Sequence, residues 1–247
     1  MSYALHGFLG LPTDWDSLGQ PFGKSFEAVK IVPISHPKNG LQKWGQAFNR
    51  WVRKDYAQKR ILLGYSQGGR LGMHALIDAP ELWSGAIIVS ANTGIPSKEE
   101  RSARLQVDLR WAERFLKDPW EPLIDDWDRQ AVFQGKKPSF PRKEADFVRS
   151  ELANAIEGWS IGRQDDLREP LSKLSCPILW VAGGKDLKYV DIAKEMADAH
   201  DRSAFWVAPD AGHRVPWECP QLFLKEINTW IEQLPLRKVK EPPFNNF

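Results

Sequence analysis

A serine flanked by glycines stands where an apolar run, Ile61–Gly64, gives way to an alanine-rich helical pattern. The residues Gly64-Tyr65-Ser66-Gln67-Gly68 match the pattern Gly-x-Ser-x-Gly. In a sharp strand-to-helix turn, glycine is needed two residues before and after the serine, because a Cβ atom there would collide with the turn or the neighbouring strand. The pattern is weak by itself, but here a predicted strand precedes it and a predicted helix follows. We therefore expect the serine hydroxyl to project above the edge of a sheet.

Short apolar runs alternate with helical patterns along most of the 247 residues. This alternation predicts an α/β fold, with a mostly parallel sheet and helices on both of its faces. The predicted strands are Tyr3–Leu5, Ala28–Val32, Arg60–Gly64, Ala86–Ser90, Ile178–Ala182 and Ala204–Val207. The predicted helices are Gln42–Tyr56, Arg70–Ile77, Val190–Ala199 and Pro220–Glu232.

The alternation stops between residues 95 and 168, a segment rich in charge and tryptophan that has no convincing strand. Ser97 and Glu100 form a capping-box pattern, which predicts the start of a helix. The segment could supply two extra helices of the core, or it could be a cap inserted after the strand Ala86–Ser90. We favour a cap of residues 95–168 on a core of residues 1–94 and 169–247, because the segment is too long for one crossover. One apolar face of its first helix is predicted at Leu105, Leu109, Ala112 and Leu116.

A serine hydroxyl reacts only when a proton acceptor and an oriented imidazole assist it. His213 follows the strand predicted at Ala204–Val207, and Asp186 follows the strand predicted at Ile178–Ala182. Both loops face the edge of the sheet that carries Ser66, so we predict a Ser66–His213–Asp186 triad. Two other aspartates compete for the acid position, but Asp210 is close to His213 in sequence and Asp191 falls in a predicted helix.

These features resemble the α/β-hydrolase superfamily over nearly the whole chain, since the chain order serine, aspartate, histidine is the one this fold uses. The fold places a second oxyanion donor in a loop after an early strand. His6-Gly7-Phe8 occupies that place after Tyr3–Leu5. We therefore expect the backbone N–H groups of Phe8 and Gln67 to form the oxyanion hole, although His6-Gly7 could be an ordinary turn.

A narrower resemblance comes from motifs beyond the serine turn. An arginine follows the last glycine of the turn, two arginines lie on the first helix of the predicted cap, and an Asp-Trp pair comes later. Together they resemble the 2-succinyl-6-hydroxy-2,4-cyclohexadiene-1-carboxylate synthases of menaquinone biosynthesis. The segments are Leu5-His6-Gly7-Phe8-Leu9-Gly10, Gly64-Tyr65-Ser66-Gln67-Gly68-Gly69-Arg70, Ser90-Ala91-Asn92-Thr93-Gly94, Glu99-Glu100-Arg101-Ser102-Ala103-Arg104, Trp111-Ala112-Glu113-Arg114-Phe115 and Asp126-Trp127.

This resemblance implies a lyase that eliminates pyruvate from an enolpyruvyl cyclohexene polycarboxylate, with the triad serine acting as a base instead of an acylated nucleophile. Residue by residue, it implies that the triad is Ser66, Asp186 and His213. The positions that contact substrate in that family match Tyr65, Arg70, Arg104 and Trp127. Guanidinium groups bind carboxylates in a bidentate manner, which suits a substrate with several carboxylates.

Each of the four substrate-contact candidates has a plainer alternative. Arg104 could pair with Asp108 one turn further along a solvated helix face. Arg70 could be a surface charge, although the start of a helix is a poor place for a cation. Trp127 could belong to the apolar core of the cap, and Tyr65 could simply pack beside the serine turn.

The composition argues against several other classes of function. A net charge of +2 does not predict nucleic-acid binding, and the apolar runs are too short to span a bilayer. The first ten residues lack the features of a signal peptide. Cys176 and Cys219 have no metal-ligand spacing and are predicted to be thiols, so we expect a cytoplasmic protein without metal or cofactor. The basic, then proline-rich tail Leu236–Phe247 has no counterpart in the family pattern.

Two other functions stay open at this point. A carboxylesterase or C–C bond hydrolase would use the same triad, with Ser66 as an acylated nucleophile. A non-catalytic relative would bind a ligand or partner on the same fold. A complete triad argues against the second of these, because a binding protein has no need of all three residues.

Overall fold

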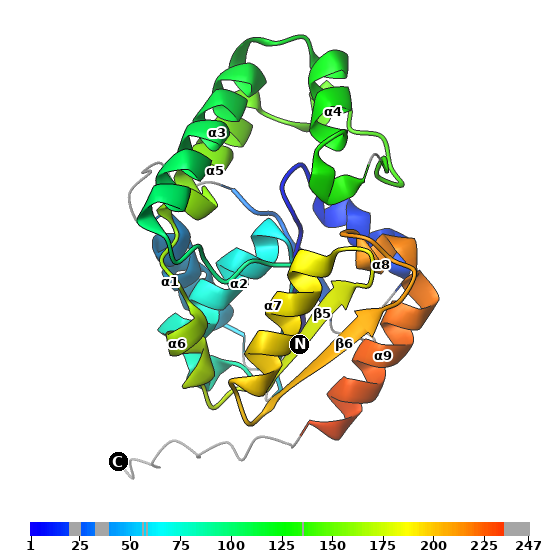
Figure 1. Cartoon of the computed structure of the whole chain (residues 1–247). Helices are drawn as coiled ribbons and strands as arrows, with labels where there is room; N and C mark the ends of the chain where they lie inside the picture. Colours follow the sequence, from blue (N-terminus) through cyan, green and yellow to red (C-terminus); the bar gives the residue numbers. More distant parts are fainter. Residues whose placement is uncertain (20–25, 33–39, 56, 58, 135, 235–247) are drawn as a thin grey trace, which may run out of the picture.

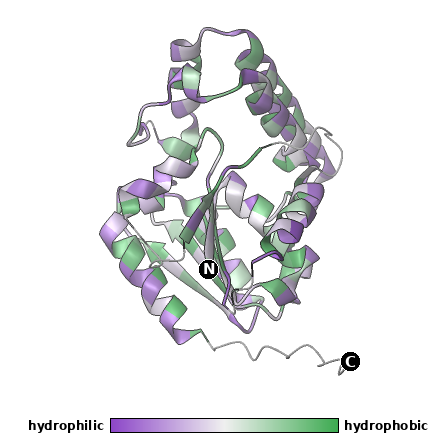
Figure 2. Cartoon of the chain, turned by 180° about the vertical axis from the view of Figure 1, so that it is seen from behind, coloured by the Kyte–Doolittle hydropathy of each residue, from purple (hydrophilic) through white to green (hydrophobic). Residues whose placement is uncertain are grey.

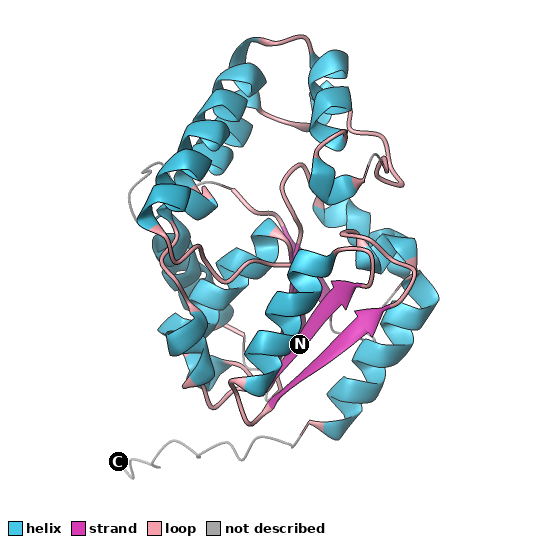
Figure 3. Cartoon of the chain, in the orientation of Figure 1, coloured by secondary structure: helices cyan, strands magenta, loops and turns pink. Residues whose placement is uncertain are grey.

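The computed structural model describes residues 1–19, 26–32, 40–55, 57, 59–134 and 136–234, which build a parallel six-stranded sheet covered by helices (Figures 1 and 3). The strand order is β2-β1-β3-β4-β5-β6, and each neighbouring pair is parallel. The predicted α/β class is therefore confirmed. The strands are β1 (Ser2–Leu5), β2 (Phe26–Val29), β3 (Ile61–Tyr65), β4 (Gly85–Val89), β5 (Ile178–Gly183) and β6 (Ser203–Ala208).

Side chains of the strands point alternately into two hydrophobic clusters, one on each face of the sheet. On β5, for example, Trp180 belongs to the first cluster and Leu179 to the second. The strands are largely hydrophobic, whereas the helices carry one apolar and one polar side (Figure 2). The first face is covered by α1 (Gly40–Val52), α2 (Gln67–Asp78), α6 (Arg168–Ser172) and α7 (Leu187–Asp198). The second is covered by the 3₁₀ helix η1 (Pro12–Leu18), α8 (Val215–Glu218) and α9 (Pro220–Gln233).

The strand predicted at Ala28–Val32 is the one whose boundaries were most wrong, because the observed β2 spans Phe26–Val29. Its neighbour β1 ends at Leu5, whose register partner is the last residue of β2. No residue of β1 is left for a longer β2 to pair with. The N–H of Ile31 donates instead to the imidazole Nε2 of His6, at 3.4 Å.

The predicted helices are found with small shifts at their ends. The helix expected at Gln42–Tyr56 is α1, which ends at Val52, and Tyr56 lies outside the described residues. The tail Leu236–Phe247 also lies outside them. Cys176 and Cys219 carry thiols, whose Sγ atoms contact nearby backbone carbonyl oxygens.

Residues 95–168 form a helical layer over the carboxyl-terminal edge of the sheet, and their described part contains no strand (Figure 1). Its helices have a hydrophobic cluster of their own, centred on Phe115, Trp120 and Leu123. The division of the chain into core and cap stays a prediction, and we call residues 95–168 the helical segment. Its helices are α3 (Lys98–Lys117), α4 (Trp120–Asp128) and α5 (Arg149–Gly158). The segment also contains the 3₁₀ helices η3 (Ala131–Phe133), η4 (Glu144–Asp146) and η5 (Ile161–Arg163). Another 3₁₀ helix, η2 (Pro80–Leu82), lies outside it, before β4.

Helix α3 begins where the capping pattern predicted, since the Ser97 hydroxyl accepts the N–H of Glu100 at 3.2 Å. The predicted apolar face is partly wrong, because Leu116 is 53% exposed. The buried residues of α3 are Asp108, Ala112 and Phe115. Phe115 fills the position in the hydrophobic cluster that was predicted for Leu116. Successive residues of a helix point about 100° apart, so Leu116 faces away from the cluster.

The glycines of the serine turn allow a stability test. A Cβ atom on Gly68 would lie 2.3 Å from the carbonyl oxygen of Leu5 and 2.4 Å from that of His6. Neither backbone atom can move without breaking the sheet. We expect Gly68→Ala to lower the free energy of unfolding, measured in urea, by about 1–3 kcal/mol. The exposed Ser102→Ala on α3 serves as control, and equal stability of Gly68→Ala and wild type would contradict the close approach.

Candidate active site

Ser66 lies in a strained turn between β3 and α2. Its backbone has φ +52° and ψ −113°, a conformation that residues other than glycine rarely adopt. The flanking glycines make this turn possible: a Cβ atom on Gly64 would lie 2.6 Å from the Cα of Gly69. The turn therefore has the geometry that the sequence pattern predicts.

The three residues of the predicted triad are linked by two contacts of hydrogen-bond length, both made by His213. The Ser66 hydroxyl lies 3.2 Å from Nε2 of His213, and Nδ1 of His213 lies 2.7 Å from the Asp186 carboxylate. His213 and Asp186 are both buried, at 4% and 8% exposure. This arrangement suits a neutral imidazole that donates to the carboxylate through Nδ1–H and accepts from the serine through Nε2. Asp186 is therefore the aspartate that meets the histidine.

The loop after β1 brings Phe8 to the same place. His6, which precedes it, is buried and contacts the carbonyl oxygen of Gly7 through Nδ1, at 2.8 Å. Its Nε2 accepts the N–H of Ile31. The two contacts fit a neutral imidazole protonated on Nδ1, and burial lowers the pKa of His6 to about 4. Phe8 and Gln67 both line the cavity next to Ser66, as required of the predicted oxyanion donors.

Backbone strain is concentrated around this site. In the described part of the chain, four residues other than glycine have positive φ: Leu9, Ser66, Ser90 and Gln134. The first three follow the carboxyl ends of β1, β3 and β4, and Ser66 and Ser90 line the cavity. Strained residues persist only where their surroundings hold them, and they cluster at functional sites.

A cavity of about 460 Å³ opens between the strand ends and the helical segment. It has charged groups of both signs, hydroxyl and amide groups, and aromatic rings on its walls. Eight of the nine predicted site residues line it: Phe8, Ser66, Gln67, Arg70, Arg104, Trp127, Asp186 and His213. The ninth, Tyr65, lines a smaller cavity of about 70 Å³ that also borders Ser66, Phe8 and Trp127.

Arg70 is a cation held by neutral oxygens. Its Nη1 donates to the carbonyl oxygen of Trp159 at 2.6 Å and lies 3.4 Å from the amide oxygen of Gln164. No carboxylate of the described residues lies within ion-pair distance of it. Burial lowers the pKa of Arg70 to about 10, so the guanidinium stays protonated at neutral pH. A partly buried cation without an anionic partner favours the binding of an anion.

Arg104 makes the ion pair with Asp108 that its spacing allowed, at 2.9 Å through Nε. Arg104 is 46% exposed, as the alternative of a solvated helix face predicted, whereas the Asp108 carboxylate is buried and also accepts the Ser160 hydroxyl at 2.7 Å. Only the Nε of Arg104 is used by described partners. Its terminal nitrogens therefore have hydrogen-bonding capacity left for a ligand in the cavity.

Sequence reasoning missed Lys188, which lines the cavity two residues after Asp186. Burial, and next the charge of Arg104, lower the pKa of the Lys188 ammonium. Its Nζ lies 5.9 Å from the ring of Tyr189, and no described carboxylate pairs with it. Lys188 stands in the first turn of α7, an unfavourable place for a cation. A cation at the start of a helix drew attention to Arg70 in the sequence, and the same feature could have identified Lys188.

Tyr65 and Trp127 both border the smaller cavity, together with Phe8. The Trp127 ring lies 4.7 Å from the ring of Phe8. The Tyr65 ring lies 5.6 Å from that of His213 and 4.9 Å from that of Trp217, and burial raises the pKa of its phenol. Tyr65 thus packs beside the serine turn, and a contact with substrate through the smaller cavity stays a prediction.

A sequence profile of the alpha/beta hydrolase family matches residues 4–226. The chain belongs to this family. It is 28% identical over 240 residues to a 2-succinyl-6-hydroxy-2,4-cyclohexadiene-1-carboxylate synthase of Yersinia pestis (strain Pestoides F), covering 93% of this chain and 86% of the relative. A synthase of the same name from Yersinia pseudotuberculosis serotype I (strain IP32953) matches equally. The resemblance drawn from the motifs is confirmed.

Solved structures share the fold. The structure of MenH from S. aureus superposes with a TM-score of 0.84 and 22% identity, over 94% of this chain and 92% of that one. A thermophilic esterase from Thermogutta terrifontis superposes with a TM-score of 0.67 and 20% identity, over 94% and 89%. At these identities the likeness concerns the fold.

None of the described helices combines the length and the apolar character needed to cross a membrane. Among the described residues, the His, Cys, Asp and Glu side chains form no group of three that could hold a metal ion.

The buried His6 predicts a dependence of stability on pH. The pKa of His6 is about 4 in the folded protein and 6.5 for an unperturbed histidine, so below pH 6.5 the unfolded chain binds a proton that the folded chain does not. The stability that neutral His6 contributes is therefore present above pH 6.5 and is lost as the pH falls toward 4. We expect the stability difference between wild type and His6→Gln to fall by about 3 kcal/mol over that window. Urea unfolding at several pH values measures it, and a difference that stays constant would contradict the buried neutral state.

Proposed function

We propose that the protein is a lyase that eliminates pyruvate from 2-succinyl-5-enolpyruvyl-6-hydroxy-3-cyclohexene-1-carboxylate and yields 2-succinyl-6-hydroxy-2,4-cyclohexadiene-1-carboxylate, a step of menaquinone biosynthesis. One observation carries the proposal: the hydroxyl of Ser66 borders a cavity whose walls bear Arg70, Arg104 and Lys188. The substrate has carboxylates on its ring, its succinyl chain and its enolpyruvyl group, which complement these cations. The names of the sequence relatives support the same reaction.

The change in double bonds shows which atoms react. The substrate has a double bond at ring carbon 3 and the product has double bonds at carbons 2 and 4. Carbon 2 therefore loses a proton, and the oxygen on carbon 5 leaves with its bonding electrons as the enolate of pyruvate. The proton that His213 holds at that point balances this charge, because the enolate takes up one proton to become pyruvate. The bond between carbon 2 and hydrogen breaks, and its electron pair moves into the ring as the carbon–oxygen bond breaks.

The triad residues can carry out the proton transfer. Asp186 orients His213, His213 draws the proton of the Ser66 hydroxyl through Nε2, and the serine oxygen takes the proton from carbon 2. The succinyl carbonyl is attached to that carbon, so negative charge builds on its oxygen. The N–H groups of Phe8 and Gln67 would stabilise this charge as an oxyanion hole stabilises a tetrahedral intermediate.

The cations of the cavity have a separate role, which is to place the substrate. Arg70 lacks an anionic partner and is the strongest candidate for a direct carboxylate contact. Arg104 and Lys188 add positive charge on neighbouring walls, from α3 and α7. Trp127 supplies an apolar surface beside the ring of Phe8. In this proposal the protein acts in the cytoplasm on a small polycarboxylate and requires no metal or cofactor.

Ester hydrolysis is the second candidate, and a specific observation favours it. The strained serine, its hydrogen-bonded histidine and the nearby oxyanion donors are the machinery of a nucleophilic hydrolase. The cations argue for the lyase, because a general esterase has no need of an unpaired guanidinium beside its serine. The assembled triad also makes a purely ligand-binding role the weakest alternative.

Release of pyruvate from the enolpyruvyl cyclohexene substrate tests the proposal. We expect wild type to release pyruvate and Ser66→Ala to be slower by at least ~100-fold, which is the scale of general acid–base catalysis. A p-nitrophenyl ester is offered in parallel. Near-normal pyruvate release by a folded Ser66→Ala variant would remove the serine from the mechanism.

Rapid quenching during turnover followed by intact-mass measurement separates the two candidates. If Ser66 is a base, no covalent adduct accumulates, because elimination needs no attack on a carbonyl group. A substrate-derived adduct on Ser66 that forms and decays at the catalytic rate would favour the hydrolase.

Arg70 should act on substrate and contribute little to fold stability. We expect Arg70→Gln to cost about 2–4 kcal/mol in kcat/KM, the range for losing a charged hydrogen-bond partner. Its melting temperature should not fall, because the partly buried cation has no carboxylate partner whose ion pair would be lost. Arg101→Gln is the matched control, since Arg101 also donates to backbone carbonyls but lies outside the cavity. Unchanged kinetics with a lowered melting temperature would assign Arg70 to the structure.

A further inference from the structure

One stretch of the helical segment contacts three of the loops that form the candidate site. We call it the clasp and define it by Asp128, Phe133, Gln134, Lys136 and Arg142. It begins at the last residue of α4. Of its residues only Phe133 lines the main cavity, whereas Asp128, Phe133 and Arg142 line the smaller cavity that borders Ser66. Its contacts reach the loops that carry the histidine, the oxyanion donor and the acid.

The clasp holds the histidine loop through Arg214, the residue after His213. Nη2 of Arg214 forms an ion pair with Asp128 at 2.7 Å, and both side chains are nearly buried, at 13% and 8% exposure. The guanidinium also lies 4.0 Å from the centre of the Phe133 ring and donates to the carbonyl oxygen of Lys136. Three clasp residues therefore fix one side chain adjacent to the histidine.

A carboxylate in the core completes the support of this loop. Glu218 on α8 accepts the N–H of Gly212 and the N–H of Arg214, each at 3.0 Å, so it bonds both residues that flank His213. Lys136 of the clasp forms an ion pair with the same carboxylate. These hydrogen bonds and Lys136 lower the pKa of Glu218 despite its burial, which keeps it charged.

The clasp holds the oxyanion loop through Asp14. Arg142 donates to Asp14 in a bidentate manner, at 2.7 Å for each nitrogen, and the two side chains are 9% and 4% exposed. The Asp14 carboxylate also accepts the N–H of Leu11 at 3.0 Å, and its backbone carbonyl accepts Nε1–H of Trp217. Arg142 is thus joined to the end of the loop that carries Phe8.

The acid loop has a smaller contact. The amide of Gln134 donates to the carbonyl oxygen of Lys185, the residue before Asp186, at 2.5 Å. Gln134 has a left-handed backbone, with φ +51°. The strained conformation thus occurs at the point where the clasp meets this loop.

Two nearly buried ion pairs at one joint call for an explanation beyond stability. Removing charges from water costs about as much as a buried pair returns, so an apolar contact would hold the joint equally well. An ion pair differs in that it fixes direction and register, above all when it is bidentate. We propose that Asp128 and Arg142 are positioning residues, which hold the His213 loop and the Phe8 loop in the geometry needed for reaction. This inference rests on the catalytic roles proposed above for those loops.

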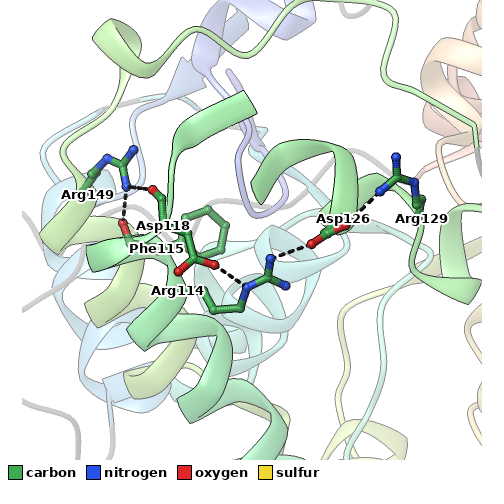
Figure 4. Close-up of polar contacts among 6 residues, drawn as sticks. All are labelled: Arg114, Phe115, Asp118, Asp126, Arg129 and Arg149. Atoms are coloured by element: carbon green, nitrogen blue, oxygen red, sulfur yellow. Dashed lines mark hydrogen bonds and ion pairs between the residues drawn. The ribbon is translucent and has the colours of Figure 1, made fainter. Parts of the chain in front are cut away.

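The test compares Asp128→Asn and Arg142→Gln with controls from the same segment. Asp126→Asn and Arg129→Gln remove an exposed ion pair, 2.8 Å long, that stays within the segment and has no contact with the catalytic loops (Figure 4). Arg114 and Arg149 in the same view show that this polar network joins α3, α4 and α5 to each other. Arg142→Lys keeps a cation that can reach one oxygen of Asp14.

Two rates are measured for each variant, together with its melting temperature. One is pyruvate release, resolved into kcat and KM. The other is covalent labelling of Ser66 by a fluorophosphonate, which reports an activated serine and a formed oxyanion hole without any natural substrate. We expect both clasp variants to lose about 10- to 100-fold in kcat and in labelling rate, with KM within about threefold, because small misplacements of catalytic groups have effects of this size. Arg142→Lys should recover part of the loss, and the controls should match wild type.

Rates within about twofold of wild type in folded Asp128→Asn and Arg142→Gln would overturn the positioning role. So would a rise in KM with unchanged kcat, which would assign the residues to substrate binding. If Arg142→Gln does not fold, Asp128→Asn and Arg142→Lys decide the matter. If the fluorophosphonate labels the wild type but the wild type releases no pyruvate, only the proposed reaction is overturned. The labelling rates of the variants then still test the positioning role of the clasp. Wild type inert in both assays overturns the two together.

Discussion

The close contact between the serine turn and the first strand determines the geometry of the site. The Cα of Gly68 approaches the carbonyl oxygens of Leu5 and His6 so closely that no side chain fits between them. This contact brings the start of α2 against the end of β1, and thereby places the loop of Phe8 beside Ser66. The parallel sheet adds the loops after β5 and β6 at the same edge. A triad from distant parts of the sequence is thus a consequence of strand order and one glycine contact.

Much of this arrangement follows from local patterns in the sequence, and the exceptions have physical causes. Strands and helices were predicted because side-chain periodicity reflects burial, and the triad was predicted because each member follows a strand. The β2 boundary was wrong since it depends on where β1 ends, and Leu116 was wrong since its neighbour Phe115 fills the cluster. The Arg142–Asp14 pair joins residues 128 apart in sequence, and no local pattern reveals such a contact.

Two cations of the cavity lack carboxylate partners. Arg70 on α2 and Lys188 on α7 line the cavity without one among the described residues, whereas Arg114 of the helical segment pairs with two carboxylates. The Asp108 carboxylate near them is already shared between Arg104 and Ser160. An anionic ligand would offset the cost of the partly buried Arg70 cation, which is why we propose that the cavity binds carboxylates.

The same triad can serve a base or a nucleophile, and the position of the substrate decides between them. A serine oxygen activated by His213 attacks a carbonyl carbon if one lies in front of it, and it takes a proton if an acidic C–H lies there instead. In the proposed function the cations on the cavity walls hold the substrate carboxylates and so determine which part of the substrate faces Ser66. The oxyanion donors serve both outcomes, since an enolate and a tetrahedral intermediate each place negative charge on an oxygen. A change of reaction within this fold therefore requires new contacts around the cavity and leaves the catalytic residues unchanged.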